Sequence, residues 1–416
     1  MSNDILIENG LLIPMTQGRP VIENSSVLIS NGIIQDAGRA EIFSRYDVKT
    51  CIDAKGKIIM PGLVNCHTHL PMSMFRGFAD DLPLDVWLNE HIFPAEAKQV
   101  NPETVEKWAY HSCTEMLLSG TTTCCDGYFY EENVVKAVAA SGIRAVAGQG
   151  IIDFPAPGVP DPLQNINIAV DFVKRTKDRY ANIYPSIFCH SAYTCSARTL
   201  IKAKSAASDL GVMFQIHAAE TENEKNMVKE AGKSSIIEYL ELTGVLDENT
   251  LLVHGVWIDD DDIELIKKAG AKVAHCPESN MKLASGIAPV TSLIERKVAV
   301  GLGTDGCASN NDHDLFGEMD TAAKLHKIAL MDPCAMDAGT VLEMATIKGA
   351  EAIGLGSVTG SIEKGKKADI ILVDTDKPHM NPMYNPFSAL VYSAKASDVS
   401  LVMVGGRILV QNGKLL

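Results

Sequence analysis

The sequence reads PGLVNCHTH from Pro61 to His69, an apolar run that ends in two histidines separated by one residue. In a β-strand, side chains alternate between the two faces, so residues two apart point the same way. We therefore expect His67 and His69 to project together from the end of one strand. Two neutral imidazoles on one face form half of a metal site, because imidazole suits zinc and related ions. The other half must come from elsewhere in the chain.

Short apolar runs alternate with helical stretches downstream of this strand. Eight strands, each followed by a helical crossover, are typical of parallel βαβ units, and a span of about 250 residues suits a closed (β/α)8 TIM-like barrel. The alternative α/β architecture, an open doubly wound sheet, predicts a Gly-rich phosphate turn after its first strand, and the sequence has none there. The predicted strands are Leu63–Asn65, Thr121–Cys125, Arg144–Gly148, Ile183–Phe188, Val212–Ile216, Thr250–Val253, Lys272–Ala274 and Val298–Gly303.

The two ends of the chain differ from the middle. The first 58 residues suggest short strands with turns at Asn9-Gly10 and Asn31-Gly32, and strands return after about residue 360. Each group is too small to make a stable sheet alone, so we expect the two groups to pair. The predicted organisation is a β-sandwich domain from 1–58 plus 360–416, with a metal-dependent catalytic barrel at 59–359 inserted between its halves.

Composition restricts the partners and the compartment. The chain has 416 residues and a formal charge of −15, so phosphates of nucleic acids and anionic lipids would repel it. Its ten cysteines include no Cys-x-x-Cys pair, which favours free thiols in a reducing compartment. The start, Met1 to Asp4, lacks a leader pattern, and no apolar run approaches the ~18 residues that span a bilayer. We expect a cytoplasmic protein without nucleic-acid or membrane partners, and leave a homo-oligomer open.

Polar residues follow the predicted barrel strands, where functional residues of such barrels gather. They are His67 and His69 after the first strand, His190 after the fourth, His217 after the fifth, His254 after the sixth and Asp305 after the eighth. Three imidazoles and a carboxylate are acceptable zinc ligands and leave one position for water. The predicted ligands are His67, His69, His217 and Asp305. Glu220, three residues after His217, and His254 then lie where groups that transfer protons are needed.

Each of these residues also has an ordinary explanation. The histidine pair could be satisfied core residues, Asp305 a turn former, and Glu220 part of a solvated acidic run. Together these explanations require several coincidences at the correct strand ends, so the metal site is the stronger interpretation. The remaining histidines are expected to be surface or structural, with His275 undecided. They are His91, His111, His313, His326 and His379.

Seven short motifs carry a family resemblance. They are PGLVNCHTH (61–69), HAAE (217–220), LVHG (252–255), HCPESN (275–280), GTDG (303–306), ASNND (308–312) and ATIKGA (345–350). With them the chain resembles the amidohydrolase superfamily, and within it the methylthioadenosine/S-adenosylhomocysteine deaminase group, close to the triazine chlorohydrolases. The likeness extends over nearly the whole chain.

The resemblance implies a (β/α)8 barrel, a flanking β-sandwich and one divalent metal per subunit, zinc before iron or manganese. It places the ligands on the four residues predicted above and proton handling on Glu220, His254 and Asp305. The fourth strand end reads Phe188-Cys189-His190, without the bridging lysine of binuclear members, which indicates one metal. The implied substrate contacts are Glu96 with ribose hydroxyls, Trp87 with the purine or its substituent, His190 with the ring, and Glu220 and Asp305 at the reacting end.

One departure from the family bears on the substrate. The family has an arginine after the third strand, but Ile151 to Asn167 contains no arginine or lysine. A substrate carboxylate would require such a charge-assisted partner, so a neutral nucleoside is favoured. We expect a hydrolytic deaminase of methylthioadenosine, 5'-deoxyadenosine, adenosine or S-adenosylhomocysteine that releases ammonia. The alternatives are a deaminase or chlorohydrolase of a triazine, guanine or pterin type ring, and a non-catalytic relative.

Overall fold

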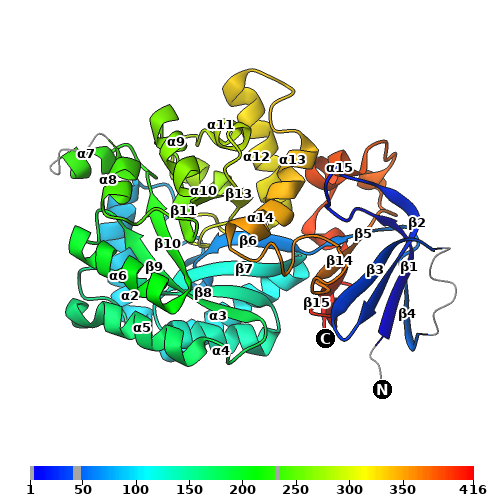
Figure 1. Ribbon diagram of the computed structural model, residues 1–416, viewed down its shortest axis with the longest axis horizontal. Helices are drawn as coiled ribbons and strands as arrows, with labels where there is room; N and C mark the ends of the chain where they lie inside the picture. The colour runs from blue at the N-terminus through cyan, green and yellow to red at the C-terminus, as the bar shows by residue number, and fades with distance from the viewer. Residues whose placement is uncertain (1–3, 41–47, 230–234) are drawn as a thin grey trace.

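Two sheets organise the computed structural model, which describes residues 4–40, 48–229 and 235–416. One is an eight-stranded sheet from the middle of the chain, and the other has nine strands drawn from both ends. Figure 1 shows the first among helices and the second on the right, where blue N-terminal strands lie beside orange and red C-terminal ones. The predicted barrel with a small β domain built from both termini is confirmed. Residues 1–3, part of the N-terminal stretch considered for a leader, lie outside the described ranges.

The eight strands of the barrel are parallel and follow one another in chain order. The barrel closes where Thr68 pairs with Asp305, whose backbone N–H donates to the His67 carbonyl at 3.0 Å. This contact joins the first strand to the last and rules out an open doubly wound sheet. The strands are β6 (Leu63–Thr68), β7 (Thr121–Tyr128), β8 (Arg144–Ile151), β9 (Ile183–Ser191), β10 (Met213–Ala218), β11 (Thr250–His254), β12 (Lys272–His275) and β13 (Val300–Leu302).

The last barrel strand is shorter than predicted. The apolar run suggested Val298–Gly303, but β13 covers only Val300–Leu302. The Val298 N–H donates to the Leu293 carbonyl and closes the turn after a helix, so this residue cannot extend the strand. Asp305 adopts a left-handed conformation with φ 62° and therefore lies outside regular strand geometry.

Helices cover the outside of the barrel in Figure 1, and local signals set several of their ends. The Asn101 side chain caps the first long helix by accepting from the N–H groups of Glu103 and Thr104. Gly142, with φ 83°, ends the next one, as a left-handed C-cap favours glycine. The helices around the barrel are α3 (Pro102–Leu118), α4 (Glu131–Ser141), α5 (Asn165–Thr176), α6 (Ala197–Leu210), α7 (Glu224–Lys229), α8 (Ile236–Leu242), α9 (Asp260–Ala269), α10 (Pro277–Lys282), α11 (Val290–Glu295), α12 (Leu315–Leu330), α13 (Ala338–Met344) and α14 (Ile347–Ala352).

A segment between β6 and α3 contributes to the site although it lies outside the regular alternation. It begins with a 3-10 turn, η2 (Leu70–Phe75), and continues through α1 (Leu84–Val86), the π-helical η3 (Trp87–Ile92) and α2 (Phe93–Gln99). Two predicted substrate contacts, Trp87 and Glu96, lie on it.

The small domain is one mixed sheet that curls on itself. Ile33 forms an isolated bridge with Lys367. This bridge brings the N-terminal edge of the sheet close to the C-terminal strands. Apolar side chains from both ends of the chain, such as Ile29 and Leu401, share one buried cluster. The predicted boundaries at 58/59 and 359/360 stay a prediction. The strands are β1 (Asp4–Leu12), β2 (Ile22–Ser30), β3 (Ile33–Arg39), β4 (Thr50–Asp53), β5 (Lys57–Pro61), β14 (Ile370–Asp374), β15 (Val399–Val404), β16 (Arg407–Gln411) and β17 (Lys414–Leu415).

A buried ion pair joins the two sheets. Arg144, the first residue of β8, donates from Nε and Nη2 to the two carboxylate oxygens of Asp369 at 2.7 and 2.9 Å. Both side chains are fully buried, and the Gly405 N–H also donates to Asp369. Within the described ranges, no helix is long and apolar enough to cross a membrane.

Candidate metal centre and active site

Three histidines and one aspartate converge at the carboxyl end of the barrel. One ligand-type atom of each lies within 4.8 Å of those of the other three: His67, His69, His217 and Asp305. The Nε2 atoms of His67 and His217 are 3.1 Å apart, and Asp305 Oδ1 lies 3.3 Å from Nε2 of both His67 and His69. An ion about 2.0–2.1 Å from each of four or five ligands spaces neighbouring ligand atoms roughly 2.9–3.6 Å apart, so these distances fit a zinc-type site.

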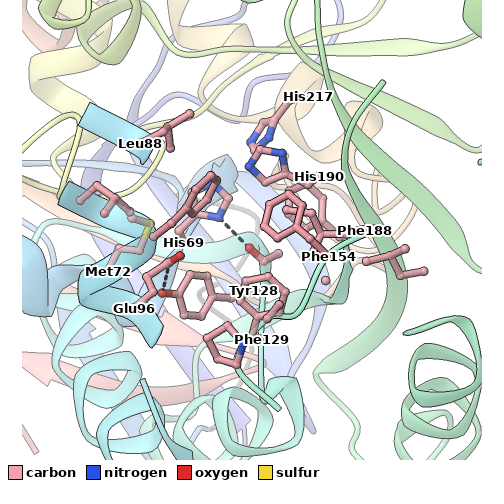
Figure 2. Close-up of a pocket in the computed structure, with 18 of the residues that line it drawn as sticks. His69, Met72, Leu88, Glu96, Tyr128, Phe129, Phe154, Phe188, His190 and His217 are labelled. Carbon is pink, nitrogen blue, oxygen red and sulfur yellow. Dashed lines mark hydrogen bonds between the residues drawn. The ribbon is translucent and has the colours of Figure 1, made fainter. Parts of the chain in front are cut away.

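The protonation of the imidazoles also suits a metal. His69 Nδ1 donates to the Gly127 carbonyl at 2.6 Å, the dashed line from His69 in Figure 2, and so Nε2 keeps its lone pair toward Asp305. Burial lowers the pKa of His67 to about 4. Burial, with the neighbouring His67, holds the pKa of His217 well below its usual value. Both are therefore neutral near pH 7, which is the form that binds metal.

The Asp305 carboxylate divides its two oxygens between different tasks. Oδ1 faces the histidines and accepts from the Gly306 N–H at 2.8 Å, whereas Oδ2 accepts from the hydroxyls of Ser279 at 2.7 Å and Ser309 at 3.0 Å. Burial alone would raise the pKa of Asp305, but the neighbouring imidazoles, His67 first, hold it well below its usual value. The group is therefore ionised, with Oδ2 held by two hydroxyls and Oδ1 directed at the ligand cluster.

Glu220 and His254 lie beside this cluster. His254 Nδ1 is 2.9 Å from the Asn280 amide oxygen and donates to it, so Nε2 is the nitrogen that faces Glu220, at 3.8 Å from Oε2. Burial raises the pKa of Glu220, and the neighbouring His254 partly opposes that shift. A carboxyl group with a raised pKa next to an imidazole is suited to proton transfer.

The acidic run that contains Glu220 is not a solvated face. Glu220 and Glu224 are buried, whereas Glu222 is exposed. The Glu224 carboxylate accepts from the N–H groups of Ala219, Glu220 and Thr221 at 2.8–3.1 Å. This side chain therefore holds the turn that presents Glu220, and the ordinary explanation of the run is wrong.

Left-handed backbone conformations occur at the strand ends that carry the site. The φ angles are 53° at Ala219, 76° at His254 and 62° at Asp305. Such conformations cost a non-glycine residue about 1–3 kcal/mol and persist where the surroundings enforce them, as at functional sites. Here the Asp305 N–H donates to the His67 carbonyl and the Gly255 N–H donates to the Ala218 carbonyl. The strained residues therefore lie where hydrogen bonds join the ends of neighbouring barrel strands.

A cavity of ≈ 320 Å³ opens above the ligand cluster and contains the remaining predicted site residues. Glu220, His254 and Asp305 line it, as do Trp87 from η3 and Glu96 from α2. His190, near the end of β9, also lines it; its Nδ1 lies 3.0 Å from Thr194 Oγ1, and burial lowers its pKa to about 3. Every predicted site residue except His67 thus lines one cavity, and His67 is fully buried with its Nε2 in the ligand cluster.

Several residues that contact the predicted ones carry no signal of that role in the sequence, among them Tyr128, Ser279, Asn280 and Ser309. The last three lie inside the HCPESN and ASNND motifs, which indicated a family but no partner for these side chains. Tyr128 is the last residue of β7, whose predicted strand ended three residues early at Cys125. A predicted strand that ran to residue 128 would have placed Tyr128 at the carboxyl end of the barrel.

The histidines set aside from the sequence do not line the cavity. His275, left undecided, is fully buried, and its Nε2 lies 3.2 Å from Nε2 of His326. Of the described residues that line the cavity, the histidines are only His69, His190, His217 and His254.

Comparison with known proteins agrees with this geometry. The profile of the Amidohydrolase family matches residues 58–409. The chain belongs to the amidohydrolase family. A protein named 5-methylthioadenosine/S-adenosylhomocysteine deaminase from Syntrophobacter fumaroxidans is 44% identical over 419 residues, covering 99% of this amidohydrolase and 94% of the relative. A 5'-deoxyadenosine deaminase from Methanosarcina acetivorans is 43% identical over 415 residues, covering 99% and 94%.

A solved structure shares the fold of this amidohydrolase closely. The crystal structure of an adenosine deaminase from Xanthomonas campestris with bound zinc superposes with a TM-score of 0.97 at 36% identity. The match covers 99% of this chain and 94% of the other.

Proposed function

We propose that this amidohydrolase is a metal-dependent hydrolytic deaminase of an adenosine-type nucleoside with an uncharged 5' group, giving the inosine analogue and ammonia. One observation carries the proposal: four ligand atoms converge beside the cavity that Glu220 and His254 line. The names of the relatives support it, since all three are named as deaminases of adenosine-type nucleosides. Those names do not favour the triazine, guanine, pterin or non-catalytic alternatives.

A single divalent ion fits the donor set, with zinc ahead of iron or manganese. The residues that would hold it are His67, His69, His217 and Asp305. Zinc in the Xanthomonas campestris structure supports this choice. A divalent ion bound here would lower the pKa of a water ligand toward about 7 and so supply a nucleophile at neutral pH.

The chain's own residues then move the protons. Glu220, with its raised pKa, donates to the ring nitrogen next to the carbon that carries the amine, so negative charge does not build on the ring as the C–O bond forms. The water proton passes to the pair formed by the Asp305 carboxylate and His254 Nε2 and from there to the amine, which leaves as ammonia when the C–N bond breaks. The hydroxyl proton of the adduct returns to Glu220 as the carbonyl forms. Positioned acid–base groups of this kind contribute about 10²–10⁴ in rate.

The wall of the cavity favours an uncharged substituent. None of the described residues that line the cavity is a lysine or arginine, whereas Glu96, Glu220 and Asp305 supply carboxylates. The carboxylate of S-adenosylhomocysteine would find no charge-assisted partner there, while a methylthio or methyl group would find apolar walls. Apolar residues that line the cavity include Ile92, Phe93, Ile152, Phe154, Pro155, Pro157 and Pro160.

A substrate panel tests the proposal. It contains adenosine, 5'-deoxyadenosine, methylthioadenosine, S-adenosylhomocysteine, guanine and a chlorotriazine, followed by the ultraviolet change on loss of the amine, with metal analysis of the same sample. We expect kcat/KM for a neutral nucleoside to exceed that for S-adenosylhomocysteine at least about tenfold, because a charge-assisted hydrogen bond contributes about 1.5–3 kcal/mol. Phe154→Arg adds a cation to the cavity wall. It should lower the ratio of kcat/KM for the neutral nucleoside to kcat/KM for S-adenosylhomocysteine, because the carboxylate then has a partner. Turnover of guanine or the chlorotriazine alone would refute the proposal, and S-adenosylhomocysteine as best substrate would refute its neutral-substrate part.

The proposal extends to compartment and assembly. The ten cysteines are free, and eight are buried, which supports a cytoplasmic location. The net charge of −15 supports a small-molecule partner rather than nucleic acid or an anionic membrane. Related barrels often self-associate, and light scattering on the purified protein would measure whether this one forms a homo-oligomer.

A further inference from the structure

We propose that Tyr128 is a positioning residue for the sugar of the substrate: its hydroxyl holds the Glu96 carboxylate where it accepts hydrogen bonds from vicinal ribose hydroxyls. The inference rests on the proposed function, because it requires a nucleoside in the cavity. Tyr128 does not itself take part in the chemistry of the amine.

The observation behind it is a short hydrogen bond between two buried side chains. The Tyr128 hydroxyl donates to Glu96 Oε1 at 2.5 Å, the dashed line between the two in Figure 2. Tyr128 is 4% exposed and Glu96 5%, and both line the cavity. Neither side chain is therefore a surface group, and both face the space that a substrate would occupy.

The two residues come from different parts of the fold. Tyr128 ends the barrel strand β7, which pairs on both sides with β6 and β8. Glu96 lies on α2, in the segment between β6 and α3 that also carries Trp87. The hydrogen bond therefore ties a substrate-contacting segment to the barrel wall, and precise placement of such groups is what gives them their effect.

The chemistry of Glu96 suits hydroxyl donors. A carboxylate offers about four acceptor sites, and Tyr128 takes one of them. Among the described residues, no other side chain donates to Glu96, so acceptors remain for a ligand. Burial raises the pKa of Glu96 to about 7, and the Tyr128 hydrogen bond opposes part of that shift. A vicinal diol presents two donors to such a group.

A competing explanation is that Tyr128 only shapes the metal centre, since its ring lies 6.2 Å from that of His69. A pair of substrates separates the two explanations. Adenosine has the 2',3' hydroxyls and 2',3'-dideoxyadenosine lacks them, while both present the same purine to the ligand cluster. A sugar-positioning role changes the ratio of their kcat/KM values, whereas damage to the metal centre lowers both alike.

The experiment compares the metal-loaded wild type with Tyr128→Phe, which removes one hydroxyl and keeps the ring. We expect the wild type to prefer adenosine and Tyr128→Phe to lose about 5- to 30-fold of that preference, mainly through KM. Metal content and kcat for dideoxyadenosine should change less than about twofold. Glu96→Gln should remove the same preference, and the double variant should lose little more, because the two residues act as one unit. Tyr110→Phe, on the exposed side of α3, is the matched control and should change nothing.

Each other outcome overturns the inference in a distinguishable way. An equal loss with both nucleosides, or loss of metal, would assign Tyr128 a purely structural role. An unchanged preference in Tyr128→Phe would show that Glu96 needs no partner. A wild type without any preference would mean that this pair does not meet the sugar. A wild type that turns over no nucleoside would refute the proposed function, and this inference with it.

Discussion

Ionisable side chains are buried at both ends of the barrel, but they are paired in different ways. At the amino end of the strands, Arg144 and Asp369 satisfy each other through two hydrogen bonds of 2.7 and 2.9 Å. At the carboxyl end, the Nε2 atom of His67 lies 3.1 Å from Nε2 of His217 and 3.3 Å from Oδ1 of Asp305, so that ligand-type atoms face one another.

The difference shows how to separate structure from function among buried charges. A buried group costs free energy unless it is paired, so a closed pair such as Arg144–Asp369 is explained by the fold itself. Acceptors that face other acceptors repel unless a proton or a cation lies between them. The carboxyl end is therefore built for a ligand and the amino end is not. The variants below test that difference.

The largest expected effect is the loss of a ligand that also handles a proton. Asp305→Ala should lose both bound metal and turnover, the latter by about 10³-fold or more, because proton transfer alone contributes about 10²–10⁴. Metal analysis and steady-state kinetics measure the two losses. Asp171→Ala, on an exposed position of α5, is the control. Full metal content together with full activity in Asp305→Ala would contradict the double role.

Glu220→Gln separates chemistry from metal binding. It should retain the metal and the fold but lose about 10²–10⁴ of kcat, because the amide cannot supply the proton. Glu222→Gln makes the same chemical change two residues away, on an exposed side chain, and should be neutral. If Glu220→Gln stays within a few-fold of wild type, its assignment as the acid is wrong.

The opposite end of the barrel should show the reverse pattern. Asp369→Ala leaves Arg144 buried without its partner and should lower the free energy of unfolding by about 3–5 kcal/mol, measured by urea denaturation. Metal content and kcat of the folded protein should not change. Glu132→Ala, which removes an exposed ion pair with Arg175, should cost less than about 1 kcal/mol. A large loss of kcat in folded Asp369→Ala would show that the two ends are coupled.

The smallest effect concerns the hydroxyls on Asp305 Oδ2. Ser279→Ala removes one of two donors and should weaken metal affinity about 10- to 100-fold, the usual effect of groups that orient a ligand. The rate of metal loss to a chelator measures it, with Ser208→Ala on the outside of α6 as control. An unchanged rate of loss would mean that Ser309 and the Gly306 N–H hold Asp305 by themselves.

Much of this molecule follows from local patterns in the chain. The alternation of apolar runs with helical stretches identifies the barrel, because strands buried on both faces are continuously hydrophobic. The spacing of His67 and His69 places both on one face, and the strand-end position of His217 and Asp305 directs them to the same mouth. Such properties depend on neighbours in the sequence or on the general topology of parallel sheets.

Other features required the folded coordinates, because they depend on side chains that meet across long separations. Arg144 and Asp369 are 225 residues apart, and nothing near either one indicates its partner. Tyr128 and Glu96 lie on a strand and on an irregular segment whose course has no periodic signal. Ser279 and Asn280 adjoin along the chain but hold different residues, Asp305 and His254. Residue types and their order are thus enough to predict the kind of chemistry. The pairing of side chains, the tautomers of the histidines and the wall of the cavity are decided only when distant segments pack together.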